Sequence, residues 1–297
     1  METKFCKASL RPAVSPDGET GFFVSAPDYD LEKTFDCGQC FRFTRILNSP
    51  YACEYEGVAH GRYVRFASGD GGLYIFGASE DEACAVWTPY LSLDTDYAAI
   101  RAQILRDLPF PAMREAVAAA GGIRILRQER FETLCSFILS QNNNIPRIKK
   151  IIEALCAYCG APLDMPRGRR YAFPTAQALA RLSENELRAL GCGFRARYIA
   201  DAARRVSSGA LELDRLPLSQ AGGALCEICG VGEKVSACVR LYGFGDLSAF
   251  PVDVWIRRSL QSHFEDGFDA MHAGIYGGVA QQYLFYYERY ILAHRKK

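Results

Sequence analysis

Leu225-Cys-Glu-Ile-Cys-Gly-Val-Gly-Glu-Lys-Val-Ser-Ala-Cys-Val239 is the stretch that says most about how this chain folds. We predict that a helix ends at Gly230, that Val231 is a single apolar anchor, and that Gly232 opens the next helix. Two glycines around one apolar residue let the backbone turn tightly and lie against another surface. The free N–H groups at the start of the second helix form a natural phosphate site.

This pattern is typical of a helix-hairpin-helix unit, which binds the DNA backbone without reading its sequence. An ordinary pair of packed helices is the alternative interpretation. The distribution of charge favours the first, because residues 1–125 carry 12 Lys+Arg against 17 Asp+Glu, whereas residues 126–297 carry 23 against 17. A polyanion such as duplex DNA is therefore expected to meet the C-terminal part of the chain.

Lys234 and Asp253 are the candidate catalytic residues. Lys234 falls in the first turn of the predicted second helix, where the positive end of the helix dipole disfavours a protonated amine and so suits a nucleophile. A surface lysine that contacts phosphate is the alternative. Asp253, in Phe250-Pro-Val-Asp-Val-Trp-Ile256, precedes another helical pattern and can serve as its N-cap. A carboxylate fixed there can stabilise positive charge that develops on a sugar.

The rest of the chain predicts an α+β fold. Segments that alternate apolar and polar residues, or form short apolar runs, predict an antiparallel sheet in residues 1–100: Phe41–Ile46, Tyr51–Val58, Arg62–Phe66 and Gly72–Phe76. From about residue 97 the apolar period becomes helical, and Ser183-x-x-Glu186 is a capping box. We expect an N-terminal antiparallel sheet domain, 1–100, and an all-helical domain, 101–297, whose final helix, about 277–293, packs back toward the sheet.

The twelve cysteines include three pairs with CxxC spacing: Cys37/Cys40, Cys156/Cys159 and Cys226/Cys229. Zinc or redox use is possible, but Cys156, Cys226 and Cys229 lie in apolar helical sequence, which favours buried free thiols in a reduced cytoplasmic protein. No cysteine follows Cys238, so a C-terminal four-cysteine iron–sulfur motif is excluded. The sequence shows no secretory signal and no apolar run long enough for a membrane span.

Several segments, in order, resemble the 8-oxoguanine DNA glycosylase/AP lyase family of the helix-hairpin-helix superfamily. They are Cys37-Gly-Gln-Cys-Phe-Arg42, Ser140-Gln-Asn-Asn-Asn-Ile-Pro-Arg147, Gly191-Cys-Gly-Phe-Arg-Ala-Arg-Tyr198, the hairpin, Pro251-Val-Asp253 and Ala280-Gln-Gln-Tyr-Leu-Phe285. The resemblance implies excision of 8-oxoguanine from duplex DNA, preferably opposite cytosine, followed by strand nicking. It implies no cofactor, no metal ion and a monomer, while the short linkers and the lack of eukaryotic extensions suggest a bacterial-type enzyme.

The resemblance also implies roles for individual residues. Lys234 would attack the sugar and form a Schiff base with the help of Asp253, and Gly38 would accept the N7–H of the lesion. Cys238 and Phe285 would enclose the flipped base, Gln281 would bind its edge, and Asn142 would fill the vacated space. Arg147, Arg195 and Phe194 would meet the opposite cytosine. Helical spacing supports two of these pairings, because Lys234 and Cys238, like Gln281 and Phe285, are four residues apart.

Trp255 departs from the family pattern, since family members commonly place a phosphate-binding histidine there; the indole N–H is a possible substitute donor. Three other functions remain open at this point. A glycosylase without lyase activity would lack the lysine, a non-catalytic hairpin protein would bind DNA only, and a zinc protein would use the CxxC pairs.

Overall fold

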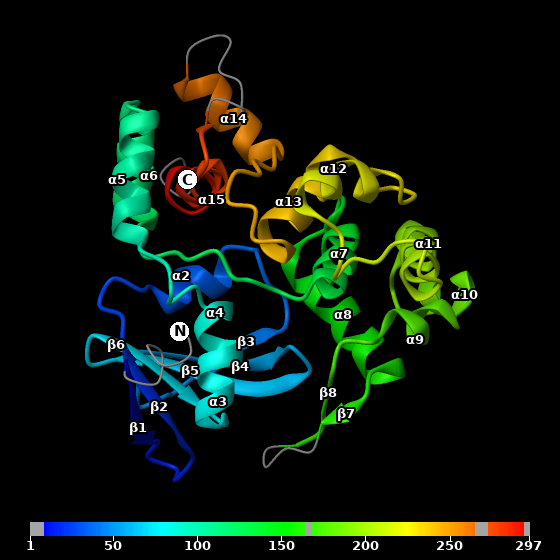
Figure 1. Ribbon diagram of the computed structural model, residues 1–297, viewed down its shortest axis with the longest axis horizontal. Coiled ribbons are helices and arrows are strands. Elements are labelled where there is room, and N and C mark those ends of the chain that lie inside the picture. The colour runs from blue at the N-terminus through cyan, green and yellow to red at the C-terminus, as the bar shows by residue number, and fades with distance from the viewer. Residues whose placement is uncertain (1–8, 164–167, 265–272, 294–297) are drawn as a thin grey trace.

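A six-stranded antiparallel sheet forms the N-terminal part of this computed structural model, which describes residues 9–163, 168–264 and 273–293. The strand order is β1-β2-β6-β5-β4-β3 (Figure 1). The strands are β1 (Leu10–Val14), β2 (Thr20–Ser25), β3 (Phe43–Arg45), β4 (Cys53–Ala59), β5 (Arg62–Gly69) and β6 (Gly72–Phe76). The predicted sheet is confirmed, with two strands, β1 and β2, that the sequence pattern did not indicate.

The sheet is held by an aromatic cluster on one face. Phe35, Phe43 and Phe66 contact one another with ring centroids 4.6–5.7 Å apart. Phe35 comes from helix α2 (Leu31–Asp36), and the cluster continues into helical turns that the sequence analysis missed: α3 (Glu80–Glu82), the π-helix η1 (Ala83–Trp87) and α4 (Thr88–Tyr90). The first hundred residues therefore do not consist of strands alone.

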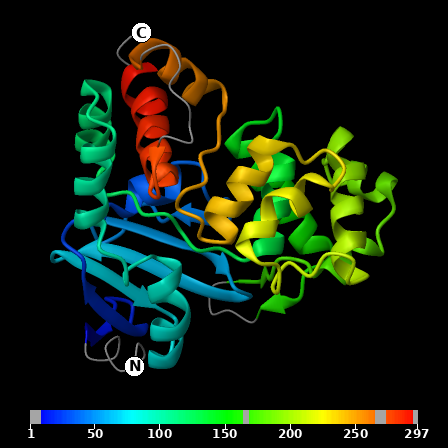
Figure 2. The same cartoon turned by 45° about the horizontal axis from the view of Figure 1, so that its top comes forward.

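The remaining chain is largely helical (Figures 1 and 2). Its helices are α5 (Tyr97–Asp107), α6 (Pro111–Ala120), α7 (Arg130–Ser140), α8 (Ile145–Cys159), α9 (Ala176–Ala180), α10 (Glu184–Ala189), η2 (Gly193–Arg195), α11 (Ala196–Ser207), α12 (Leu218–Cys226), α13 (Glu233–Gly243), α14 (Val254–His263), α15 (Gly277–Tyr286) and η4 (Tyr287–Leu292). A two-stranded hairpin, β7 (Pro162–Leu163) with β8 (Arg170–Tyr171), interrupts it, so this part is not all-helical.

Local end signals explain several of these helices. Ser183 and Glu186 form the predicted capping box of α10, and Gly191, with φ +96°, follows its end. The final helix, α15, packs against α6 beside the sheet, and continues into η4 (Figure 2). Among the described residues, no helix has the length and apolar content that a membrane crossing requires.

Candidate lesion-binding and catalytic site

A cavity of about 620 Å³ lies where α13, α15, the loop between α7 and α8, and the loop after α2 meet. This volume is in the range of small-ligand sites, which run from about 300 to 1,000 Å³. Seven of the predicted site residues line it: Lys234, Asp253, Gly38, Cys238, Gln281, Phe285 and Asn142. Positions almost 250 residues apart in sequence therefore share one surface.

Lys234 reaches the cavity from the second residue of α13. Gly232 is the helix N-cap and provides no side chain, so the first turn keeps its outward N–H groups. The Lys234 side chain is half-buried, and its Nζ lies 5.6 Å from the centroid of the Phe137 ring. An amine in this position is partly desolvated and lies against the Phe137 ring, which suits attack on a bound electrophile.

Asp253 is the N-cap of α14, as the sequence predicts. Its Oδ1 accepts hydrogen bonds from the backbone N–H groups of Trp255 at 3.0 Å and Ile256 at 2.9 Å. Both bonds end on Oδ1, so among the described residues Oδ2 has no assigned donor. The helix start thus fixes a carboxylate at the cavity with one oxygen available.

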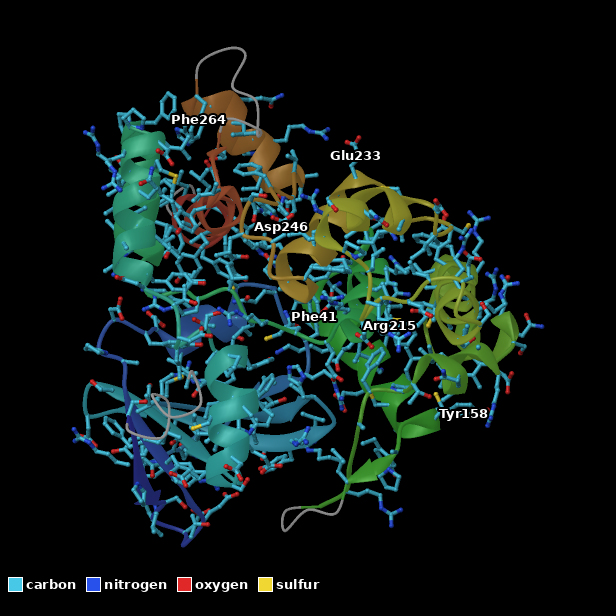
Figure 3. The ribbon with its side chains drawn as sticks, in the orientation of Figure 1. Phe41, Tyr158, Arg215, Glu233, Asp246 and Phe264 are labelled. Carbon is cyan, nitrogen blue, oxygen red and sulfur yellow. The ribbon has the colours of Figure 1, made fainter. Side chains whose placement is uncertain are left out.

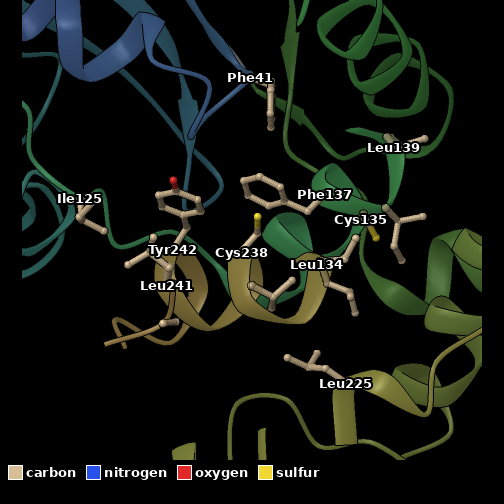
Figure 4. Close-up of a cluster of buried hydrophobic side chains, with 14 of the residues drawn as sticks. Phe41, Ile125, Leu134, Cys135, Phe137, Leu139, Leu225, Cys238, Leu241 and Tyr242 are labelled. Carbon is tan, nitrogen blue, oxygen red and sulfur yellow. The ribbon is translucent and has the colours of Figure 1, made fainter. Parts of the chain in front are cut away.

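Cys238 lies one helical turn after Lys234, and its sulfur faces the rings of Phe137 and Tyr242 (Figure 4). Those two rings stack with centroids 5.2 Å apart. Burial raises the pKa of the Cys238 thiol, while Lys234, which hydrogen-bonds the sulfur, opposes that rise. Cys238 is therefore a buried, neutral thiol at the cavity wall. Phe285 lies on α15 and also lines the cavity, with the Arg289 guanidinium 5.5 Å from its ring centroid.

Gly38 adopts φ +83°, a conformation that favours glycine. Its neighbours are held tightly. Gln39 is fully buried, and its Nε2 donates to the carbonyls of Thr34 and Arg124, each at 2.8 Å. Its Oε1 accepts from the N–H of Leu126 at 2.9 Å. This segment is therefore anchored on both sides, which fixes Gly38 at the cavity.

Gln281 and Gln282 are both buried in the middle of α15 but have different surroundings. Gln282 accepts a hydrogen bond from the Tyr242 hydroxyl and donates to the carbonyl of Cys37 at 3.5 Å. Gln281 lines the cavity, and its Oε1 is buried without a donor among the described residues. A buried oxygen without a donor is costly, so a ligand that donates a hydrogen bond fits here.

Asn142 sits in the α7–α8 loop with φ +48°, in the left-handed region. Arg195 braces this turn. Its Nε donates to the carbonyl of Gln141 at 2.7 Å and its Nη2 donates to the carbonyl of Asn142 at 2.8 Å. Arg195 is buried, and burial, together with the nearby Arg147, lowers its pKa. Its guanidinium also lies 4.3 Å from the ring centroid of Phe194, which is 46% exposed.

Arg147, Phe194, Arg195 and the hairpin do not line the cavity. Arg147 is exposed on the first turn of α8, beside the Asn142 loop. In the hairpin, Val231 is buried and anchors the turn, whereas Gly230 and Gly232 are exposed. Glu233, the first residue of α13, lies at the surface beside them (Figure 3). Arg147, Phe194, Gly230 and Gly232 are thus exposed, whereas Arg195 and Val231 are buried.

Gly230 cannot become alanine without strain. Its φ is +76°, and a Cβ would meet the ring of Tyr198 at 2.5 Å. We expect Gly230→Ala to cost about 1–3 kcal/mol of stability and to weaken binding to undamaged duplex, because the turn must move away from the ring. Thermal unfolding and fluorescence anisotropy measure both effects.

Gly223→Ala is the matched control for this substitution. Gly223 lies on α12, and a Cβ there meets nothing within 4 Å. Alanine favours a helix over glycine, so this variant should be as stable as the parent or more so, and should bind DNA unchanged. Equal binding by Gly230→Ala and the parent would contradict the role of the turn.

Sequence reasoning missed the residues that support the site, namely Gln39, Gln282, Tyr242 and Phe137. Gln39 belongs to the Cys37–Arg42 segment and Gln282 to the Ala280–Phe285 segment. Their presence in these family-like segments was the one sequence signal that could have identified them. Their partners are distant in sequence. Trp255, already identified as a departure, also lines the cavity.

Comparison with known proteins agrees with this architecture. Residues 22–134 match the family model of the 8-oxoguanine DNA glycosylase N-terminal domain, and residues 135–267 match that of the HhH-GPD superfamily base excision DNA repair protein. A crystal structure of the Clostridium acetobutylicum 8-oxoguanine glycosylase/lyase, in complex with duplex DNA that has cytosine opposite 8-oxoguanine, is 33% identical. The similarity covers 94% of this chain and 97% of that one, with a TM-score of 0.84.

Curated relatives align over part of their length. N-glycosylase/DNA lyase OGG1 of Arabidopsis thaliana is 36% identical over 154 residues, which are 49% of this chain and 42% of the relative. The N-glycosylase/DNA lyase of Saccharomyces cerevisiae is 36% identical over 159 residues, 48% of this chain and 42% of the relative. The aligned region thus spans less than half of these two relatives.

The fold, the hairpin and the cavity define a base excision DNA repair protein of the helix-hairpin-helix superfamily. Within that class, the chain belongs to the 8-oxoguanine DNA glycosylase family.

Proposed function

We propose that this protein flips 8-oxoguanine out of duplex DNA, cleaves its glycosidic bond through Lys234, and nicks the strand by β-elimination. Its preferred partner base is cytosine. The observation that carries the proposal is the composition of one cavity. It is lined by the Lys234 amine, by the Asp253 carboxylate that caps α14, and by the Gln281 Oε1, which has no hydrogen-bond donor among the described residues. Because all these groups come from one chain, we also propose that a monomer is sufficient.

The buried Gln281 Oε1 supports a guanine-like ligand. The Watson–Crick edge of guanine carries N–H donors at N1 and N2, which would satisfy this oxygen. Phe285 and Cys238 line the same cavity and offer apolar surfaces to the two faces of a flat base. A base out of its stack needs both kinds of contact, since flipping costs a few kcal/mol.

Gly38 is the proposed discriminator between lesion and normal guanine. 8-Oxoguanine carries a hydrogen on N7, whereas N7 of guanine is only an acceptor. A rigid backbone carbonyl accepts a hydrogen bond from the first and repels the lone pair of the second. The anchoring of Cys37 by Gln282 and of Gln39 by its four buried bonds supports this assignment, because a mobile carbonyl would not discriminate.

The proposed chemistry proceeds in order. The Lys234 amine attacks C1′ and the base leaves with the glycosidic electrons, while Asp253 stabilises the positive charge on the sugar. Opening of the sugar ring gives a Schiff base between Nζ and C1′. Loss of a C2′ proton then breaks the C3′–O bond, which nicks the strand on the 3′ side.

Arg147 is the proposed reader of the opposite cytosine. It is exposed beside the Asn142 turn, and a guanidinium supplies several donors to the acceptor atoms of an unpaired cytosine. We expect Arg147→Ala to reduce the preference for cytosine over the other three opposite bases by about tenfold, since a good bidentate contact contributes about 1–3 kcal/mol of discrimination. Single-turnover excision rates with each opposite base measure it.

Lys150→Ala removes a cation from an exposed position on the same helix and serves as the control. Its preference for cytosine should equal that of the parent. The same panel of duplexes tests the proposed function, because a non-catalytic hairpin protein would bind every duplex and release no base. An unchanged cytosine preference in Arg147→Ala would transfer the reading role to Arg195.

Arg195 is proposed to act in two ways. In the free protein its Nε and Nη2 are bound to carbonyls of the Asn142 turn, so Nη1 is the group available to a base. Phe194, which stacks on it, is exposed and suits insertion beside the opposite base. Arg195 thus couples the shape of the Asn142 turn to contact with the opposite strand.

A further inference from the structure

Two exposed cysteines lie immediately before the glycine turn of the helix-hairpin-helix unit. Cys226 ends α12 and Cys229 precedes Gly230. The sequence analysis favoured buried thiols at these positions, and the structure contradicts it, because both are exposed. Among the eleven free cysteines of the described chain, the other nine are buried or half-buried. The apolar residues that made the segment look internal are Leu225 and Ile228, which are buried and belong to the helical core.

The local backbone brings the two thiols to one side. Glu227 continues the helical conformation with φ −73° and ψ −16°. The N–H of Ile228 donates to the carbonyl of Leu225 at 3.2 Å, and the N–H of Val231 donates to that of Ile228 at 3.0 Å. The chain therefore curves around the inward Ile228 side chain. Two outward cysteines three residues apart on such a bend can reach disulfide geometry, in which α-carbons lie about 4.4–6.8 Å apart.

Cys229 lies near a cation, Arg197. Tyr198, which accepts a hydrogen bond from Arg197 at 2.9 Å, and the nearby Cys229 sulfur both raise the pKa of Arg197. Arg197 therefore remains cationic beside this sulfur. The carboxylate of Asp201 also lies close, since its Oδ2 accepts from the N–H of Cys229 at 2.9 Å, but Arg205 pairs with it at 3.2 Å. An exposed thiol near a cation is the kind that reacts with oxidants.

We propose that Cys226 and Cys229 form a peroxide-reactive dithiol that protects the hairpin from acquiring a permanent negative charge. The Cys229 thiol releases its proton and the sulfur attacks hydrogen peroxide; the O–O bond breaks, the sulfur becomes a sulfenic acid, and the leaving hydroxide takes up the released proton to form water. The Cys226 thiol then attacks the sulfenic sulfur, the S–S bond forms, and the oxygen leaves as a second water. The two cysteines lose two electrons and the peroxide gains two, so a thiol reductant reverses the change.

Cys226 is needed because Cys229 alone would be oxidised irreversibly. A sulfenic acid that no thiol resolves takes a second oxygen from peroxide and becomes a sulfinate, which thiols do not reduce. That anion would lie one residue from Gly230, beside the backbone N–H groups proposed to hold DNA phosphates, and would repel them. This step rests on the proposed DNA contact of the hairpin, whereas disulfide formation itself does not.

The experiment treats the full chain with hydrogen peroxide and compares the parent with Cys226→Ser. We expect the parent to lose two hydrogens in a peptide that links Cys226 to Cys229, by mass spectrometry. We expect Cys226→Ser to gain two oxygens on Cys229 instead. After reduction with dithiothreitol, the parent should recover its affinity for undamaged duplex, and Cys226→Ser should remain weaker by about fivefold at low salt.

Cys159→Ser, which removes a half-buried thiol on α8, is the matched control and should behave as the parent. Sulfinate on Cys229 of the parent at the same peroxide dose, or two unlinked thiols throughout, would overturn the proposal. A linked pair with unchanged DNA affinity in oxidised Cys226→Ser would overturn the protective role. Base excision by untreated protein is measured separately, so failure of the glycosylase proposal is distinguishable from failure of this one.

Discussion

Lys234→Gln should form no covalent adduct with an 8-oxoguanine duplex in the presence of borohydride. Borohydride reduces the Schiff base between Nζ and C1′ to a stable amine, so the adduct requires that nitrogen. Glutamine keeps a long polar side chain in the half-buried position between Cys238 and the Phe137 ring, but its amide is not nucleophilic. We expect excision to fall by about a thousandfold or more, measured as the single-turnover rate.

Lys150→Gln is the control for this experiment, because the same change is made at an exposed lysine on α8 outside the cavity. It should form the adduct at the rate of the parent. The binding of Lys234→Gln to lesion DNA should persist, since the hairpin backbone and the cavity walls are unaltered. An adduct that survives in Lys234→Gln would assign the nucleophile to another residue.

Asp253→Asn should separate the structural from the chemical role of the α14 cap. Asparagine is as good an N-cap as aspartate, so it can accept from the N–H groups of Trp255 and Ile256 as Oδ1 does now. The variant should therefore unfold at the temperature of the parent. It lacks the negative charge that would stabilise the cationic sugar, and we expect the excision rate to fall by about 10²–10³.

Asp253→Ala completes the comparison, because it removes both roles. It should lose activity to a similar extent and also about 1 kcal/mol of stability, the usual cost of an absent N-cap. Thermal unfolding and single-turnover kinetics on the three proteins give both quantities. Full excision activity in Asp253→Asn would show that charge at this position does not contribute to the reaction.

The features that the sequence predicted well are those determined by neighbours in the chain. The hairpin glycines, the Asp253 cap and the Ser183 capping box depend on turn and cap chemistry within about four residues. The fold class followed from a change of apolar period along the chain. Helical spacing also placed Cys238 beside Lys234, where the structure has it.

Other features depend on contacts that no local pattern contains. Gln39 bonds the carbonyl of Arg124, 85 positions away, and Gln282 bonds that of Cys37, 245 positions away. Strand β1 contains Pro12, which argues against a central strand but is tolerated here because β1 is at the sheet edge. Cys226 and Cys229 were misread because the neighbouring core residues Leu225 and Ile228 gave their segment an internal appearance.

The loop after α2 is the part of the sheet domain that enters the cavity, through Cys37, Gly38 and Phe41. Lys234, Asp253, Gln281 and Phe285 all come from the helical part. The enzyme that we propose therefore takes its reactive residues from the helical part and its lesion-discriminating carbonyl from the sheet domain. A substitution where these two parts meet, such as the loss of Gln39, would leave the excision chemistry in place but remove the preference for 8-oxoguanine over guanine.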